Sequence, residues 1–303
     1  MTIGVSSRLL WLDITKALAI ILMVLGHTSI PKTVSDFIFA FHMPVFFLAS
    51  GWCMDWGKYS FGELFRRRCK NLLLPFIVYS ALVIGLSMLM DEQLFSLSKG
   101  WLGYALWFVP VLFLATLLAK LITAIKKKSF RIIALIGCIG AGMWLCYSHT
   151  QLPWTISTVP YATFLILSGT YLRRWENVIS EPRWYIVVGG IAVVAIISHF
   201  WRLDLAWNKI LPVVPLTVGA LSGAAMLATI SSYIEKGPKW ITNIFLLIGK
   251  ETFAIMAFSQ IIIIALNKYF VLNPILKYAL LAAILTVIIY AKNLLKKAID
   301  VAK

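Results

Sequence analysis

Residues 9–30 decide the fold, and they read LLWLDITKALAIILMVLGHTSI. The run holds only three ionisable residues, Asp13, Lys16 and His27. The run reaches the length of about 20 residues that a helix needs to cross about 30 Å of hydrocarbon. A signal-peptide core is shorter and precedes a small-residue cleavage site, which is missing before the next apolar run. The segment is therefore predicted to be a retained membrane-spanning helix.

The rest of the chain repeats this apolar character. Of its 303 residues, 61% are hydrophobic and 13% are charged, and its mean hydropathy is +0.88, which is too apolar for a water-soluble domain. Turn and charge signals predict an all-α, polytopic transmembrane helix bundle, with residues 1–303 as a single membrane-embedded domain without internal repeats. About ten spans are expected, at 9–29, 37–56, 71–90, 101–125, 131–149, 155–172, 185–201, 211–234, 243–266 and 275–297.

The net charge of +16 reflects membrane topology rather than nucleic-acid binding, because the basic residues form short clusters between the apolar runs. With ten spans, nineteen lysines and arginines fall on one side and six on the other. Positive charge resists translocation, so the richer side is predicted to be cytoplasmic, with both termini inside. The expected location is the inner cell membrane as a multi-pass protein, with membrane lipid as a partner and no nucleic acid.

The four cysteines carry no metal-binding or redox pattern. Cys53, Cys69, Cys138 and Cys146 form no C-x-x-C pair and have no histidine at ligand spacing. They are predicted to be packing residues, and no metal is expected.

Ionisable residues in the first span form one stripe. Asp13 and Lys16 lie three residues apart, close enough to pair across one helical turn. His27 follows Lys16 by eleven residues, which places it on nearly the same face about 16 Å further along the helix. A turn at Pro31 then leads to His42, and a helical hairpin would place both histidines at a similar depth. Charged groups inside hydrocarbon are costly, so the stripe is a candidate functional site.

Two interpretations of the histidines remain open on spacing alone. Histidine is the usual general base at neutral pH, and His27 suits the deprotonation of a hydroxyl that attacks a thioester. Alternatively, His27 and His42 are interfacial residues that satisfy backbone groups or face lipid headgroups.

The motifs around these histidines resemble the acyltransferase 3 family, and most of all its fucose 4-O-acetylase-like branch. Residues 12–27, LDITKALAIILMVLGH, resemble the family's first helix, in which ten residues separate a basic residue from an essential histidine. Residues 41–51, FHMPVFFLASG, resemble its second-helix signature. Further similarities are the basic run RRRCK at 66–70, Pro75, LWF at 106–108 and GKET at 249–252. Many members carry arginine where this chain has Lys16, and relatives commonly have a histidine where it has Gln260.

This resemblance implies an integral membrane O-acyltransferase without a metal. The donor would be an acyl-CoA, usually acetyl-CoA, used from the cytoplasm, and the acceptor a hydroxyl of a cell-surface sugar, polysaccharide or lipid-linked glycan. The expected catalytic residues are His27, Lys16, Asp13 and His42. The expected donor-binding residues are Arg66, Arg67, Arg68, Lys70 and Trp107.

Several donor-site residues also have a simpler explanation. Guanidinium groups suit the phosphates of coenzyme A, but the basic run at 66–70 is equally explained as a topology anchor. Trp107 either lines an acyl tunnel or packs within the bundle. Glu251 either belongs to the donor pocket or forms a snorkelling pair with its neighbour Lys250.

The rival function is a secondary transporter or flippase, since intramembrane Asp, Lys and His also build proton relays. That class predicts repeated halves and interrupted helices at matching positions. No repeat is found, although Pro212 and Pro215 interrupt the eighth run. A non-catalytic scaffold leaves the stripe on the first span without a reason.

Overall fold

The computed structural model describes residues 9–92, 95–96, 101–102, 104–179 and 181–301, and nearly all of them lie in helices. The predicted all-α class is confirmed, apart from a pairing of two two-residue strands, β1 (Phe95–Ser96) and β2 (Trp101–Leu102). The α-helices are α1 (Leu10–Gly26), α2 (Lys32–Phe39), α3 (His42–Trp52), α4 (Phe61–Arg68), α5 (Leu74–Leu89), α6 (Phe108–Ala124), α7 (Lys128–Tyr147), α8 (Val159–Leu172), α9 (Glu176–Ile179), α10 (Trp184–Phe200), α11 (Val213–Glu235), α12 (Lys239–Lys250), α13 (Thr252–Tyr269) and α14 (Pro274–Val301).

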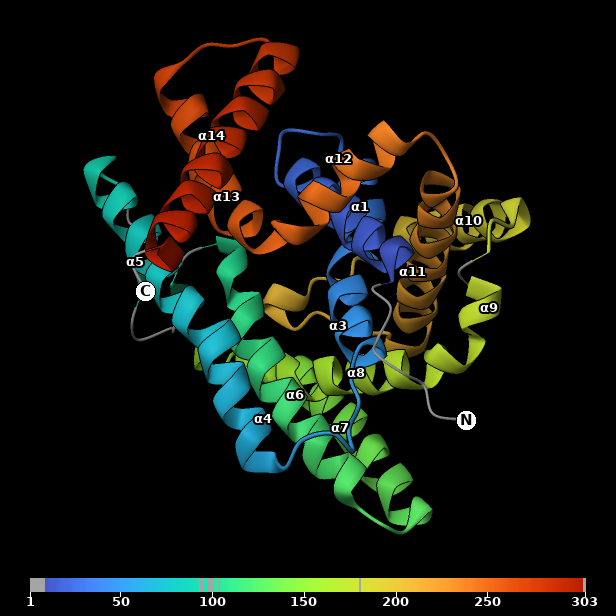
Figure 1. Cartoon of the computed structure of the whole chain (residues 1–303). Coiled ribbons are helices and arrows are strands. Elements are labelled where there is room, and N and C mark those ends of the chain that lie inside the picture. The colour runs from blue at the N-terminus through green and yellow to red at the C-terminus, as the bar shows by residue number, and fades with distance from the viewer. Residues whose placement is uncertain (1–8, 93–94, 97–100, 103, 180, 302–303) are drawn as a thin grey trace.

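Short π-helical and 3₁₀-helical segments lie between some of these helices. A π-helical segment, η1 (Cys69–Leu73), joins α4 to α5, so that the two form one long rod (Figure 1). The 3₁₀ segments are η2 (Tyr104–Trp107), η3 (Pro153–Thr158), η4 (Arg173–Trp175) and η5 (Leu205–Trp207).

The chain is a multi-pass membrane protein. Within the described residues, seven helical segments are long and apolar enough to cross a bilayer, and α10 is a shorter apolar helix. The candidate spans at 128–147 and 274–294 bury little of their surface inside the bundle, as expected of helices that face lipid. The number of ten spans remains a prediction, because α1 and α10, at 17 residues each, and α8, at 14, fall below the usual spanning length.

Three predicted spans have different boundaries in the structure. The predicted span 37–56 is divided into α2 and α3, because Phe41 turns inward between them and packs where α11 has only Gly223. The predicted span 71–90 is the second part of the rod that begins at Phe61, so the basic run at 66–70 is helical rather than a loop. The predicted span 243–266 is divided at Glu251 into α12 and α13.

The division at Glu251 lets α12 lie across α1 (Figure 1). Gly249 permits this approach, since a Cβ atom there would lie 2.2 Å from the backbone oxygen of Asp13. Helix α1 is also in contact with α3, α11 and α13, so the part of the predicted stripe at Asp13 and Lys16 is surrounded by helices. This position is what keeps Asp13 buried.

Reporter fusions test the predicted topology. A reporter placed after Lys128, at the start of α7, is expected on the cytoplasmic side, and one after Lys209, before α11, on the opposite side, because three spans separate them. Paired alkaline phosphatase and green fluorescent protein fusions measure the side directly. Reporters on the same side would contradict the ten-span topology.

Candidate active site

The first candidate site is a cavity at the Lys16 end of the stripe, called here the Lys16 cavity. It has a volume of about 310 Å³, and its polar lining comes from Lys16, Ser50, Cys53, Arg68 and Thr252. The Nζ atom of Lys16 lies 2.6 Å from Oδ1 of Asp13, so the pair expected across one turn is present. Phe46, Phe108 and Phe253 are among the apolar lining residues. The cavity therefore combines fixed positive charge with an apolar wall.

Only one arginine of the basic run reaches this cavity. Arg68 is partly buried, and its Nη2 atom contacts the sulfur of Met54 at 3.0 Å. Arg66, Arg67 and Lys70 are exposed, and the Arg67 guanidinium lies over the ring of Tyr59, 4.3 Å from its centre. The structure thus separates Arg68, beside Lys16, from three surface residues.

The second candidate site is a smaller cavity at the C-terminal end of α1, called here the histidine cavity. It has a volume of about 30 Å³ and is lined by residues that include His27, His42, Phe39 and Trp107. The centres of the two imidazole rings lie 6.4 Å apart. The ring of Phe39 contacts both, with its centre 5.5 Å from that of His27 and 4.9 Å from that of His42. Trp107, predicted to bind the donor, thus lies beside the histidines and not in the Lys16 cavity.

Hydrogen bonds to the backbone determine which ring nitrogen of each histidine can act as a base. Nδ1 of His27 lies 2.7 Å from the carbonyl oxygen of Met23, and Nδ1 of His42 lies 2.9 Å from that of Ile38. A carbonyl oxygen only accepts, so both Nδ1 atoms must carry the hydrogen when the rings are neutral. The lone pair is then on Nε2 of each ring. His42 is 2% exposed, whereas His27 reaches the protein surface, which makes His27 the base accessible to an incoming hydroxyl.

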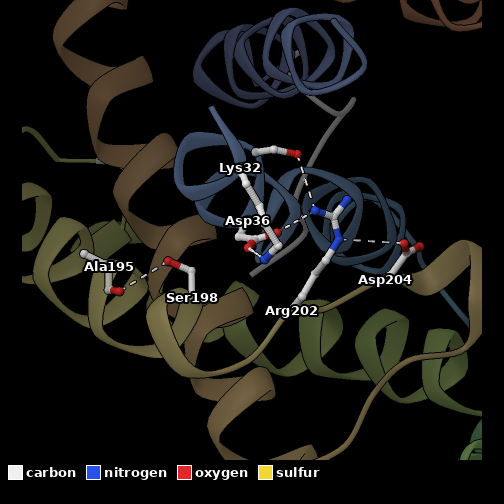
Figure 2. Close-up of polar contacts among 7 residues, drawn as sticks. Lys32, Asp36, Ala195, Ser198, Arg202 and Asp204 are labelled. Carbon is white, nitrogen blue, oxygen red and sulfur yellow. Dashed lines mark hydrogen bonds and ion pairs between the residues drawn. The ribbon is translucent and has the colours of Figure 1, made fainter. Parts of the chain in front are cut away.

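Residues that the sequence interpretation passed over complete the histidine cavity. Asp204, from the segment between α10 and α11, lines it together with both histidines. Its neighbour Arg202 lies over the ring of Phe39, with the guanidinium carbon 3.9 Å from the ring centre. Nη1 of Arg202 also lies 2.5 Å from Oδ1 of the buried Asp36, which Lys32 contacts as well (Figure 2). The predicted outer loop is therefore part of the site wall.

Glu251 has a different role from either one expected of it. Its carboxylate forms an ion pair with Lys292 and accepts a hydrogen bond from Nδ2 of Asn293 at 3.4 Å, both on α14. The predicted ion pair with Lys250 was wrong, because the partner is Lys292. Glu251 is also not among the residues that line the Lys16 cavity. Glu251 therefore connects α14 to the junction of α12 and α13. Among the described residues, no group of three His, Cys, Asp or Glu side chains is placed to hold a metal ion.

Comparison with known proteins gives one match. A family model described as an acyltransferase domain matches residues 9–293, which is nearly the whole chain and includes both cavities. No curated protein and no solved structure matches.

Proposed function

Because the chain belongs to the acyltransferase 3 family and is a membrane acyltransferase, we propose that it is an O-acetyltransferase of the inner cell membrane. Its donor is acetyl-CoA, bound from the cytoplasm. Its acceptor is a hydroxyl group of a cell-surface sugar, polysaccharide or lipid-linked glycan on the outer side. A fucose 4-O-acetylase-like activity is the form of this proposal that the motifs of α1 and α3 favour.

The observation that carries the proposal is the presence of two cavities along α1, one beside Lys16 near the middle of the helix and one beside His27 at its C-terminal end. The Lys16 cavity offers a lysine and an arginine to an anionic donor, and the histidine cavity offers an accessible base. Eleven residues of helix separate Lys16 from His27, or about 16 Å. The extended pantetheine arm of coenzyme A is long enough to span this distance. The phosphates can therefore remain near Arg68 while the thioester reaches His27.

The reaction needs only one base and a path for its proton. Nε2 of His27 removes the proton of the acceptor hydroxyl while the hydroxyl oxygen forms a bond with the acyl carbon. The carbon–sulfur bond then breaks, and the proton on His27 passes to the leaving sulfur, which departs as coenzyme A thiol. Lys16, oriented by Asp13, holds the donor along the stripe. His42 positions the acceptor or assists the proton transfer.

Purified protein in lipid nanodiscs tests the proposal directly. Incubation with acetyl-labelled acetyl-CoA and extracted envelope glycan is expected to move the label to the glycan and release coenzyme A thiol in equal amount. A parallel experiment uses the same protein in sealed proteoliposomes, where label that crosses the membrane without forming an ester would instead support the transporter function. No ester and no thiol release would contradict the proposal.

A single arginine substitution tests the donor site. Arg68→Gln is expected to raise the KM for acetyl-CoA about tenfold or more, because a charge-assisted hydrogen bond to phosphate contributes about 1.5–3 kcal/mol. Steady-state kinetics of thiol release measure this value. Arg66→Gln is the matched control, since that residue is on the same helix but does not line the Lys16 cavity. Equal KM values for both variants would reduce the basic run to a topology signal.

A further inference from the structure

The hydrogen bond that orients His27 does not supply the negative charge that would stabilise a protonated imidazole ring. When His27 takes a proton, its ring becomes a cation. The group that holds Nδ1 is the carbonyl of Met23, which carries only a partial negative charge. In catalytic sites where a carboxylate holds Nδ1, that carboxylate also stabilises the imidazolium. Here a carboxylate has to come from elsewhere.

Asp204 is the one carboxylate among the residues that line the histidine cavity in the described part of the chain. Its side chain is 14% exposed and comes from a firmly held turn, in which the backbone groups of Asp204 and Lys209 exchange hydrogen bonds of 3.1 Å and 2.8 Å. Burial raises the pKa of Asp204 above its usual value, while Arg202, Lys209 and His27 act in the opposite direction. The charge of His27 is therefore within electrostatic reach of this carboxylate.

The nearby arginine does not neutralise Asp204 by a direct hydrogen bond. Nε of Arg202 lies 3.9 Å from Oδ2 of Asp204, which is beyond hydrogen-bond distance. The same guanidinium is held by Asp36 at 2.5 Å and by the face of Phe39. Figure 2 shows Arg202 between the two carboxylates and in contact with both, with a hydrogen bond to Asp36 and a longer ion pair to Asp204. Asp36 therefore holds Arg202 by a direct hydrogen bond, whereas Asp204 has only a longer ion pair with Arg202 and a hydrogen bond from the backbone of Ala206. Asp204 also lines the cavity that contains His27.

We infer that Asp204 is a positioning residue of the acyl transfer, whose carboxylate faces His27 across the histidine cavity and stabilises the imidazolium that forms when the acceptor hydroxyl loses its proton. This inference rests on the proposed function and adds a residue that the motifs of α1 and α3 do not contain. Asp204 itself exchanges no proton. The proton of the hydroxyl passes to His27 and then to the sulfur of coenzyme A.

The other charged groups around His27 are accounted for. His42 of α3 is buried, with its Nδ1 held by the carbonyl of Ile38. Arg202 is hydrogen-bonded to Asp36 and forms a longer ion pair with Asp204, and Lys32 of α2 contacts the same Asp36. Tyr278 of α14 hydrogen-bonds to Thr28 at 3.0 Å, beside His27. The remaining group is Lys209, which acts on Asp204. Asp204 is therefore the negative group that can respond to the protonation of His27.

The test replaces Asp204 by its neutral isostere. Asp204→Asn is expected to lower kcat for acetyl transfer about tenfold or more, because stabilisation of the developing cation is lost while the donor site is intact. The KM for acetyl-CoA should stay within about twofold of the wild-type value. The limb of the pH–rate profile that falls toward acid should move to lower pH, since the amide no longer favours the protonated imidazole.

Asp36→Asn is the matched control. It removes a carboxylate that holds the same arginine but is absent from the cavity lining, so its acid limb should stay at the wild-type position. If both variants lose the same activity and neither moves the acid limb, the role of Asp204 is only to hold Arg202, and the inference is wrong. A fully active Asp204→Asn with an unchanged profile also overturns it.

Folding and the proposed function are controlled separately. Size-exclusion chromatography in detergent and thermal stability show whether each variant is intact. Should the asparagine variant not fold, Asp204→Ser and Asp204→Ala remove the same charge and are judged by the same two results. Wild-type protein that transfers no label would overturn the proposed function, and the inference with it. Wild-type transfer together with an unaffected Asp204 variant would overturn the inference alone.

Discussion

His27→Ala is expected to abolish acetyl transfer, with a fall in rate of about 10²–10⁴, the usual contribution of a positioned general base. The reason is geometric, because His27 is the one of the two cavity histidines that reaches the surface, and its Nε2 lone pair is not used by the hydrogen bond to the backbone. Acetyl-CoA binding should survive, since the Lys16 cavity lies near the middle of α1 and His27 is not part of its lining. Label transfer to glycan and donor binding by filter retention measure the two effects.

His42→Ala provides the comparison for this result. His42 is buried and in contact with Phe39. Its replacement is expected to cost less activity, because the acceptor reaches the exposed His27 before it reaches His42. Both variants must insert and elute as intact protein before their rates are compared. Full acetyl transfer by an intact His27→Ala protein would refute the proposed mechanism and favour the transporter function.

The parts of the site that could be predicted are contacts between residues that lie close together in the sequence. The pair of Asp13 and Lys16 follows from helical spacing, which is a local property. The proximity of His27 and His42 follows from the short connection between two apolar segments. The existence of most helices follows in the same way from the length of each apolar run.

The parts that could not be predicted depend on contacts between distant segments. Arg202 counted only as one basic residue of an outer loop, yet it lies on Phe39 and pairs with Asp36, which precede it by more than 160 positions. A signal was present, because Asp204 is one of only twelve acidic residues and is enclosed by apolar segments. The helix break at Phe41 is equally non-local, since it depends on the space beside Gly223.

Substitution of one glycine is expected to have the largest effect on folding. Helices α3 and α8 pack so closely that a Cβ atom on Gly51 would lie 1.7 Å from the backbone oxygen of Ile166. A Cβ on Gly169 would lie 2.0 Å from that of Leu48, so each helix uses a glycine to approach the other's backbone. Gly51→Ala should therefore force the helices apart and cost at least the upper end of the about 1–3 kcal/mol typical of overpacking.

The expected result is loss of intact protein, measured as a missing monodisperse peak in fluorescence-detected size-exclusion chromatography and a lower unfolding temperature. Gly85→Ala is the matched control, because Gly85 also lies inside a helix, α5, but an added Cβ there meets nothing within 4 Å. That change should be neutral or slightly stabilising, since alanine favours helix more than glycine does. An intact Gly51→Ala protein with wild-type stability would mean that α3 and α8 do not cross at these glycines. The path of α3 from His42 to the Lys16 cavity would then have to be redrawn, because Ser50 and Cys53 flank this crossing and line that cavity.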